Sequence, residues 1–145
     1  MNERHKEELI EWTRRFIQSR NALLSDVISQ KEGVDGFDIV VETKTKTQNY
    51  LIIPDLTDLP EALDSLGSKG AYLVTLNTKR NLDNTSSHWD ELIQHNQLCL
   101  IFVNPDSRSD QKWAIYPATH AMLTETKKLR AGLLSLSSTV EEYKK

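Results

Sequence analysis

Seven carboxylates lie within about 30 residues in the middle of the chain. They are Asp35, Asp38, Glu42, Asp55, Asp58, Glu61 and Asp64. Carboxylate oxygens are the ligands that hard divalent cations prefer, so such a cluster can hold a metal ion. It can equally be a solvated surface, because acidic side chains are common at helix starts and strand ends without any further role. Both interpretations remain open from the residue types alone.

The second group of residues that could do chemistry is aromatic and basic. Residues 113–120 combine Trp113, Tyr116 and His120 in one run, and basic side chains flank it: Arg108, Lys112, Lys127, Lys128 and Arg130. Aromatic rings stack on unpaired bases and cations contact phosphates, so this region is the candidate nucleic-acid-binding site. The alternation of residues 113–116 also fits a strand that packs Trp113 and Tyr116 in a core.

The overall charge argues against a strong non-specific affinity for nucleic acid. The chain has 21 acidic and 18 basic residues, a net charge of −3, and residues 33–103 carry ten of the acidic residues but only five of the basic ones. With a pI near 5.8 there is no global positive field. Any DNA or RNA partner must therefore be bound by a local patch.

Length and composition indicate an ordinary globular chain. We expect 145 residues to form a single domain, 1–145, with enough core to need no disulfides. Cys99 is the only cysteine and lies in an apolar run, which favours a buried packing role over a nucleophilic one. A lone cysteine, together with the absence of a long apolar run, predicts a cytoplasmic protein with no membrane contact.

The hydrophobic patterning predicts the elements that must position these residues. Apolar residues at helical spacing predict a long helix over residues 3–29. Strands are expected at 37–43 and 50–53, joined as a hairpin by the polar run 44–49. A helix over 61–66, a buried strand at 71–76, a polar loop at 77–87 and a helix over 88–96 follow. The last elements are strands at 98–103 and 113–116 and a long C-terminal helix whose apolar stripe is Leu129, Leu133, Leu136, Val140 and Tyr143.

Strands that alternate with single helices predict an α/β fold with a mixed sheet covered by helices. The apolar stripes of the two terminal helices have two uses. Either stripe can pack on the sheet of its own chain, which a small sheet requires, or it can form a homodimer with a second copy.

This order of elements resembles the restriction-endonuclease-like core of the PD-(D/E)XK nuclease superfamily, over about residues 3–103. In that superfamily an acid on the second core strand and an acid-x-Lys triplet on the third precede a helix. Two placements of the motif compete on this chain. The literal triplet Glu42-Thr43-Lys44 lies on the same strand as Asp38, so period-2 geometry puts Asp38, Glu42 and Lys44 on one face. Placement by topology instead pairs Asp38 with Asp55, in the segment Pro54-Asp55-Leu56 that leads into a helix.

The resemblance implies a nuclease-like domain with a nucleic-acid-linked role. It implies Asp38 and Asp55 as ligands of Mg²⁺ or Mn²⁺, with Glu42 or Lys44 assisting, in metal-dependent phosphodiester hydrolysis at a weakened site. Its alternative is a catalytically inert binding or oligomerisation module of the same fold. A lysine is absent from the triplet position under the second placement, and the remaining acids are few for a metal centre.

Overall fold

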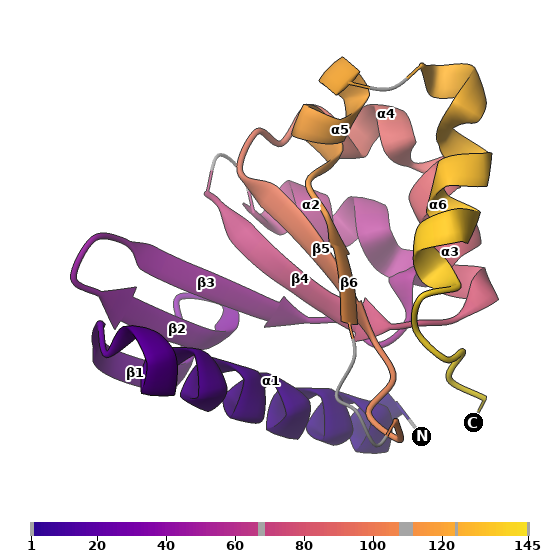
Figure 1. Ribbon diagram of the computed structural model, residues 1–145. Helices are drawn as coiled ribbons and strands as arrows, with labels where there is room; N and C mark the ends of the chain where they lie inside the picture. The colour runs from indigo at the N-terminus through magenta and orange to yellow at the C-terminus, as the bar shows by residue number, and fades with distance from the viewer. Residues whose placement is uncertain (1, 67–68, 108–111, 124, 145) are drawn as a thin grey trace.

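The computed structural model describes residues 2–66, 69–107, 112–123 and 125–144 (Figure 1). Its centre is a six-stranded mixed sheet in which the strands lie in the order of the sequence. The strands are β1 (Val27–Val34), β2 (Phe37–Thr43), β3 (Thr47–Ile52), β4 (Ala71–Leu76), β5 (Leu98–Val103) and β6 (Lys112–Ile115). The first three pair antiparallel, β4 and β5 run parallel to β3, and β6 returns antiparallel to β5.

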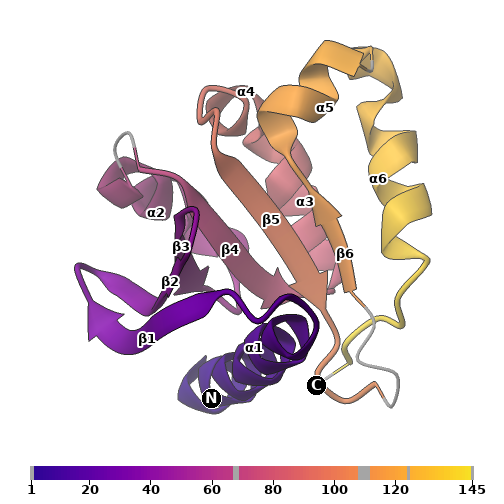
Figure 2. The ribbon, with the colours of Figure 1, turned by 60° about the vertical axis from the view of Figure 1, so that its left-hand side comes forward.

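Helices cover both faces of this sheet, as an α/β fold requires (Figures 1 and 2). The helices are α1 (Asn2–Leu24), α2 (Leu59–Leu66), α3 (Lys79–Ser87), α4 (Trp89–Leu92), α5 (Pro117–Leu123) and α6 (Leu129–Ser137), with short 3₁₀ turns η1 (Leu56–Asp58) and η2 (Thr126–Lys128). We call the two sides the α1 face, which carries Tyr50, Val74 and Ile101, and the α3 face, which carries Leu73 and Leu100.

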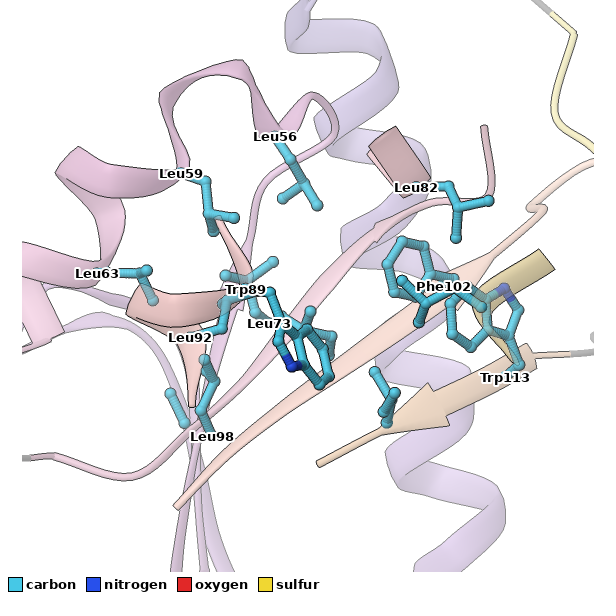
Figure 3. Packing of buried hydrophobic residues seen from close by; sticks show 14 of the residues in the cluster. Leu56, Leu59, Leu63, Leu73, Leu82, Trp89, Leu92, Leu98, Phe102 and Trp113 are labelled. Carbon is cyan, nitrogen blue, oxygen red and sulfur yellow. The ribbon is translucent and has the colours of Figure 1, made fainter. Parts of the chain in front are cut away.

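Each face of the sheet has its own core. On the α1 face, Leu9 and Trp12 of α1 pack against apolar residues of β2 to β5. On the α3 face, leucines of α2, α3, α4 and α6 belong to one cluster with Phe102 and Trp113. Figure 3 shows Leu82 beside this aromatic pair, with Leu59, Leu63 and Leu92 toward the other end of the cluster. The rings of Phe102 and Trp113 are stacked with centroids 4.0 Å apart. All six residues of β5 are buried because helices or the tail of the chain cover both of its sides.

The predicted α/β class is confirmed, and the apolar strands at 71–76 and 98–103 lie where they were expected. The hairpin between β2 and β3 and the long N-terminal helix are also confirmed. The helix ends five residues earlier than predicted, however. Ser25 adopts a positive φ of 51°, and the Val27 amide donates to Asn21 Oδ1 at 3.1 Å. Residues 27–34 then form β1, a strand that the helical spacing of Val27 and Ile28 concealed.

The polar segment 77–87, predicted as a loop, is mostly helix α3. Thr78 caps this helix by accepting a hydrogen bond from the Asn81 amide at 3.1 Å. The Asn81 side chain accepts from the Leu56 amide and donates to the carbonyls of Pro54 and Leu76. The Asn81 side chain therefore bonds to distant parts of the chain and not to neighbouring backbone groups, as it would in a loop. Segment 77–87 is mostly helical for this reason, although it is rich in residues that favour loops.

The long C-terminal helix is also a wrong prediction. The segment is divided into α5, η2 and α6, and the stripe residues Val140 and Tyr143 lie beyond the last helix. Both are buried, Val140 on the α3 face and Tyr143 on the α1 face, so the tail passes from one side of the sheet to the other. In the described ranges, no helix combines the length and the apolar character needed to cross a bilayer.

Candidate functional site

Asp38 is the second residue of β2 and connects three elements. Its Oδ2 accepts a hydrogen bond of 2.7 Å from the Ile52 amide at the end of β3. Its Oδ1 lies 3.0 Å from the Lys6 ammonium of α1, and the side chain is only 18% exposed. Both carboxylate oxygens therefore already have partners. A metal ion at Asp38 would have to compete with the Lys6 charge for the same oxygen.

Asp55 caps the turn η1. Its Oδ1 accepts from the Thr57 amide at 2.9 Å and from the Thr57 hydroxyl at 2.5 Å, and Arg80 Nη1 lies 3.6 Å from its other oxygen. Desolvation opposes ionisation of this carboxyl, but the hydrogen bonds from Thr57 and the charge of Arg80 outweigh it and lower its pKa. These contacts keep Asp55 ionised, and they are the contacts of a residue that caps a helical turn.

Glu42 and Lys44, the other predicted catalytic residues, are exposed at the far end of β2 from Asp38. Four residues of strand separate Asp38 from Glu42 by roughly 13 Å. Among the residues that the structure describes, no three His, Cys, Asp or Glu side chains are grouped as metal ligands. The donor set formed by Asp38, Asp55, Glu42 and Lys44 therefore does not fit a divalent metal centre by itself.

The predicted basic residues are distributed over both faces. Lys127 and Lys128 lie in η2 and Arg130 is the second residue of α6, on the α3 face. Lys127 pairs there with Glu125, and Arg130 pairs with Asp83. Lys112 begins β6 and points to the other side, with its Nζ 5.3 Å from the Phe16 ring centroid on α1. Arg108 lies outside the described residues.

The two candidate aromatic residues have different environments. Trp113 is buried on the α3 face and its indole nitrogen donates to Asn77 Oδ1 at 2.8 Å, so its predicted packing role is confirmed. Tyr116 follows β6 and remains 50% exposed. Core packing, the alternative considered for both residues, therefore applies to Trp113 and only partly to Tyr116.

Lys112, Ala114 and Tyr116 alternate along β6 with the buried Trp113 and Ile115, which places them together on the α1 face. Helix α1 lies near the first residue of β6, Lys112, whose Nζ contacts the Phe16 ring, and it leaves Ala114 and Tyr116 exposed (Figure 2). Two pockets adjoin this row, one near each of its ends. A further pocket on the α1 side lies along the helix and is lined by Glu7, Glu8, Glu11 and Asp106 among others.

The larger pocket has a volume of about 650 Å³ and lies where β3, β4 and β5 begin. Its side-chain walls include Lys46, Lys69, Tyr72, Cys99 and Tyr116. Its shape depends on close backbone packing: Asn49 Nδ2 donates to the Gly70 carbonyl at 3.1 Å, and a Cβ on Gly70 would lie 2.8 Å from Gln97 Oε1. Only glycine fits there without displacing Gln97 from the pocket wall.

A row of tyrosines and one thiol backs this pocket. Tyr50 and Tyr72 stack with ring centroids 5.0 Å apart, and the Tyr116 hydroxyl lies beside Tyr72 and Cys99. Desolvation raises the pKa of Tyr116 to about 12 and that of the Cys99 thiol to about 11. The Tyr116 hydroxyl and the Cys99 thiol are therefore neutral at physiological pH, and Cys99 has the inert packing role that its apolar strand predicted.

The smaller pocket, of about 180 Å³, lies between α1 and the start of β6. It is lined by Trp12, Arg15, Phe16, Ser19 and Lys112. Among the described residues that line the two pockets, none is acidic, although the whole chain has more acidic than basic residues. We call the surface around these two pockets the basic face, defined by Arg15, Lys46, Lys69, Lys112, Tyr72 and Tyr116. Arg15 also lines an acidic pocket along α1, and the Lys69 ammonium lies 5.7 Å from the ring centroid of Phe37, which packs on the α3 face.

Most of the basic face could not be recognised in the sequence. The alternation of residues 112–116 does place Lys112 and Tyr116 on one side of a strand, and that was the only local signal. Lys46, Lys69 and Arg15 come from a turn, a strand entry and a helix, which only the fold brings to one side. No protein-family model, curated protein or solved structure matches this chain, so its function must be inferred from these side chains.

Proposed function

We propose that this chain is a domain that binds single-stranded nucleic acid through its basic face, on a restriction-endonuclease-like core that does not hydrolyse the strand. The observation that carries the proposal is the coincidence of cationic and exposed aromatic side chains without acidic neighbours in the pocket walls. Proteins that bind single strands combine a positively charged groove with aromatic rings on which bases stack.

The arrangement along β6 suits a strand better than a duplex. Lys112 and Tyr116 lie on the same side of one strand, four residues and roughly 13 Å apart. A base can stack on the exposed ring of Tyr116 only if it is unpaired. The order α1, antiparallel β1 to β3, α2 and parallel β4 is also compatible with the core that the sequence resembles.

Binding of fluorescein-labelled oligothymidylate and oligouridylate, followed by anisotropy at several salt concentrations, tests this proposal. We expect the logarithm of the association constant to fall linearly with the logarithm of salt concentration. Each phosphate contact contributes about 0.7 to that slope for a single strand. The double variant Lys46→Gln/Lys112→Gln should therefore reduce the slope by about 1.4.

The aromatic contribution is tested with Tyr116→Leu, which keeps an apolar side chain and removes the ring. Loss of one stacked base costs about 1–3 kcal/mol, so we expect affinity to fall by a factor between about 5 and about 150. The matched control is Lys127→Gln/Lys128→Gln, which removes two charges from the opposite face. The proposal would be contradicted if Lys46→Gln/Lys112→Gln and Lys127→Gln/Lys128→Gln lost the same affinity. It would also be contradicted if the wild type showed no salt-dependent binding.

The second candidate function is metal-dependent phosphodiester cleavage at Asp38. The Lys6 ammonium lies 3.0 Å from Asp38 Oδ1, so an acid and a lysine are adjacent there as in a nuclease site, but a metal ion would have to displace this lysine from the oxygen. Calorimetric titration with Mn²⁺ separates the two candidates. Our main proposal predicts no specific binding, whereas saturable binding that is lost in both Asp38→Asn and Asp55→Asn would favour cleavage.

A further inference from the structure

Gln48 is a nearly buried polar side chain without a hydrogen-bond partner. It lies on β3, two residues before Tyr50 and on the same side of the strand, and is 6% exposed. Within the described residues, its side-chain amide forms no hydrogen bond to the backbone or to another side chain. Buried amides are almost always bonded, because a hydrogen bond left unmade costs free energy. A partner from outside the chain would explain this exception.

The Gln48 amide is accessible to such a partner. It is not among the unpartnered polar atoms that the fold encloses completely, in contrast to the hydroxyl of Tyr50. Gln48 lines the larger pocket of the basic face, so its open amide belongs to the wall of this pocket. The rest of the side chain is buried, which holds the amide in place before a ligand arrives and reduces the cost of ordering it.

Aromatic side chains form the remainder of the wall across the sheet. Strands β4 and β5 separate β3 from β6, so Gln48 and Tyr116 lie at opposite sides of the pocket that both of them line. Tyr72 of β4 lies between them, and Gly70, two residues earlier, contributes no side chain. A planar ring that stacks on the exposed Tyr116 can therefore turn its edge toward the Gln48 amide.

The size of the pocket fits a nucleobase with its sugar. Its volume of about 650 Å³ is within the roughly 300–1,000 Å³ of pockets that enclose small organic ligands. A base can enter such a pocket only when it is unpaired, and it then exposes the hydrogen-bonding groups of its edges.

The hydrogen-bonding groups of the pocket select among the bases. A glutamine amide carries a donor and an acceptor side by side, which complement N7 and the 6-amino group of adenine. Thymine offers only one acceptor and a methyl group on its corresponding edge, and cytosine is read there by carboxylates. None of the described residues that line this pocket is acidic. Guanine is read by Arg or Lys, but Lys46 and Lys69 are exposed and lack the fixed position of Gln48.

We propose that this pocket binds one unpaired adenine, with the ring stacked on Tyr116 and the Gln48 amide bonded to N7 and the 6-amino group. The proposal rests on the proposed function in that the adenine belongs to a single strand lying on the basic face. It adds a base preference to an interaction that phosphate contacts alone would leave independent of sequence.

Fluorescein-labelled oligothymidylate that carries one central adenine tests this preference by anisotropy. A bidentate pair discriminates against a wrong base by a factor of about 5 to about 150, so the strand with adenine should bind tighter than pure oligothymidylate by such a factor. Replacing this adenine by 7-deazaadenine removes the N7 acceptor and keeps the stacking surface. We expect this replacement to weaken binding at least threefold.

Gln48→Met keeps the length of the side chain and removes its amide. Strands with adenine and with 7-deazaadenine should bind this variant equally, whereas Gln30→Met should retain the full difference. Gln30 is the matched control because it lies across Val41 from Gln48, on the same face but outside the pocket. The melting temperature of Gln48→Met should not fall, because the amide has no partner in the free protein. A purely structural role would lower it.

The possible outcomes separate this proposal from the proposed function. Salt-dependent binding with equal affinity for strands with and without adenine would reject the adenine pocket and leave the proposed function standing. A preference for guanine or cytosine, or an adenine preference that survives in Gln48→Met, would also overturn the pocket.

If no oligonucleotide binds, titration with adenosine decides. The side-chain NH₂ signals of Gln48 in a ¹H–¹⁵N correlation spectrum are identified by their loss in Gln48→Met. A saturable shift of these signals would support the pocket as a site for a free adenine nucleoside and reject the proposed function. Signals that stay in place at millimolar adenosine would reject both.

Discussion

The indole nitrogen of Trp113 donates a hydrogen bond of 2.8 Å to Asn77 Oδ1, and both side chains are buried. The amide nitrogen of the same asparagine donates to the carbonyls of Ser137, Val140 and Glu141 at 3.0–3.3 Å. The backbone carbonyl of Asn77 also accepts from the Tyr143 amide at 2.9 Å. One residue after β4 thus joins β6 to the C-terminal segment.

Replacing this asparagine should loosen the C-terminal segment. Asn77→Ala leaves the Trp113 N–H and the three carbonyls without their partner, so we expect a loss of about 3 kcal/mol in the free energy of unfolding. Urea denaturation measures the loss, and hydrogen exchange should show the largest loss of protection at residues 138–143. Asn104→Ala, which removes one donor to the Glu141 carbonyl and the acceptor of the Asp106 amide, should cost less. Equal losses of unfolding free energy in the two variants would contradict the role of Asn77 as the main link to the C-terminal segment.

The end of α1 offers a stabilising substitution. Ser25 has a φ of 51° and its amide donates to the Asn21 carbonyl at 2.7 Å, the geometry in which glycine is favoured after a helix. We expect Ser25→Gly to stabilise the protein by about 0.5–1 kcal/mol, because the residue no longer resists the left-handed conformation. Thermal denaturation measures this gain, and Ser25→Ala should show none.

The opposite effect is expected in the β1–β2 turn. Asp35 and Gly36 both have positive φ values, 56° and 83°, as in two-residue hairpin turns. A Cβ on Gly36 would contact nothing within 4 Å, so Gly36→Ala tests backbone conformation without a steric clash. We expect a loss of about 1 kcal/mol in the free energy of unfolding. Asp35→Asn should be nearly neutral because asparagine tolerates this conformation.

Stability should fall in acid. The hydrogen bond from Arg14 lowers the pKa of Glu32, and contacts of Thr57 and Arg80 lower that of Asp55. A carboxyl whose pKa is lower in the folded than in the unfolded state stabilises the fold above the unfolded value, near pH 4, and loses this contribution as pH falls through the folded value. The melting temperature should therefore decline below about pH 4. Glu32→Gln and Asp55→Asn should each reduce that decline, and an unchanged profile in both would contradict the assignment.

Cys99 should resist thiol reagents in the native state. Burial raises its pKa to about 11, compared with about 8.5 for a free cysteine, so its thiolate fraction near pH 8 is lower by roughly 300-fold. We expect labelling by a disulfide reagent at pH 8 to be slower than in urea by at least that factor. Because the folded-state pKa is the higher one, the contribution of Cys99 to stability is complete below pH 8.5 and is lost as pH rises toward 11. Rapid native labelling would show that the thiol is exposed.

Residues 71–76 and 98–103 show what the sequence can determine by itself. Both are continuous apolar runs between polar segments, and a strand covered on both sides is the structure in which nearly every side chain of such a run is buried. The α/β class follows from their alternation with helices. The side of β6 that carries Lys112 and Tyr116 follows equally from the period of two residues along a strand.

Segment 77–87 shows where local information ends. Its Asn and Thr side chains favour turns in isolation, and it is a helix because Asn81 finds partners at Pro54, Leu56, Thr75 and Leu76. These partners are up to 27 residues away along the chain, so no local propensity contains them.

The candidate sites depended on tertiary structure for the same reason. Asp38 has the residue type of a metal ligand, but its partners are Lys6 on another element and the Ile52 amide on the next strand. The smaller pocket likewise joins Trp12 on α1 to Lys112 on β6, a hundred residues later. The sequence determined which residues could do chemistry. Only the packing of α1 against the sheet decided which of them are already paired and which face an open pocket, because hydrogen bonds and ion pairs are satisfied in space and not along the chain.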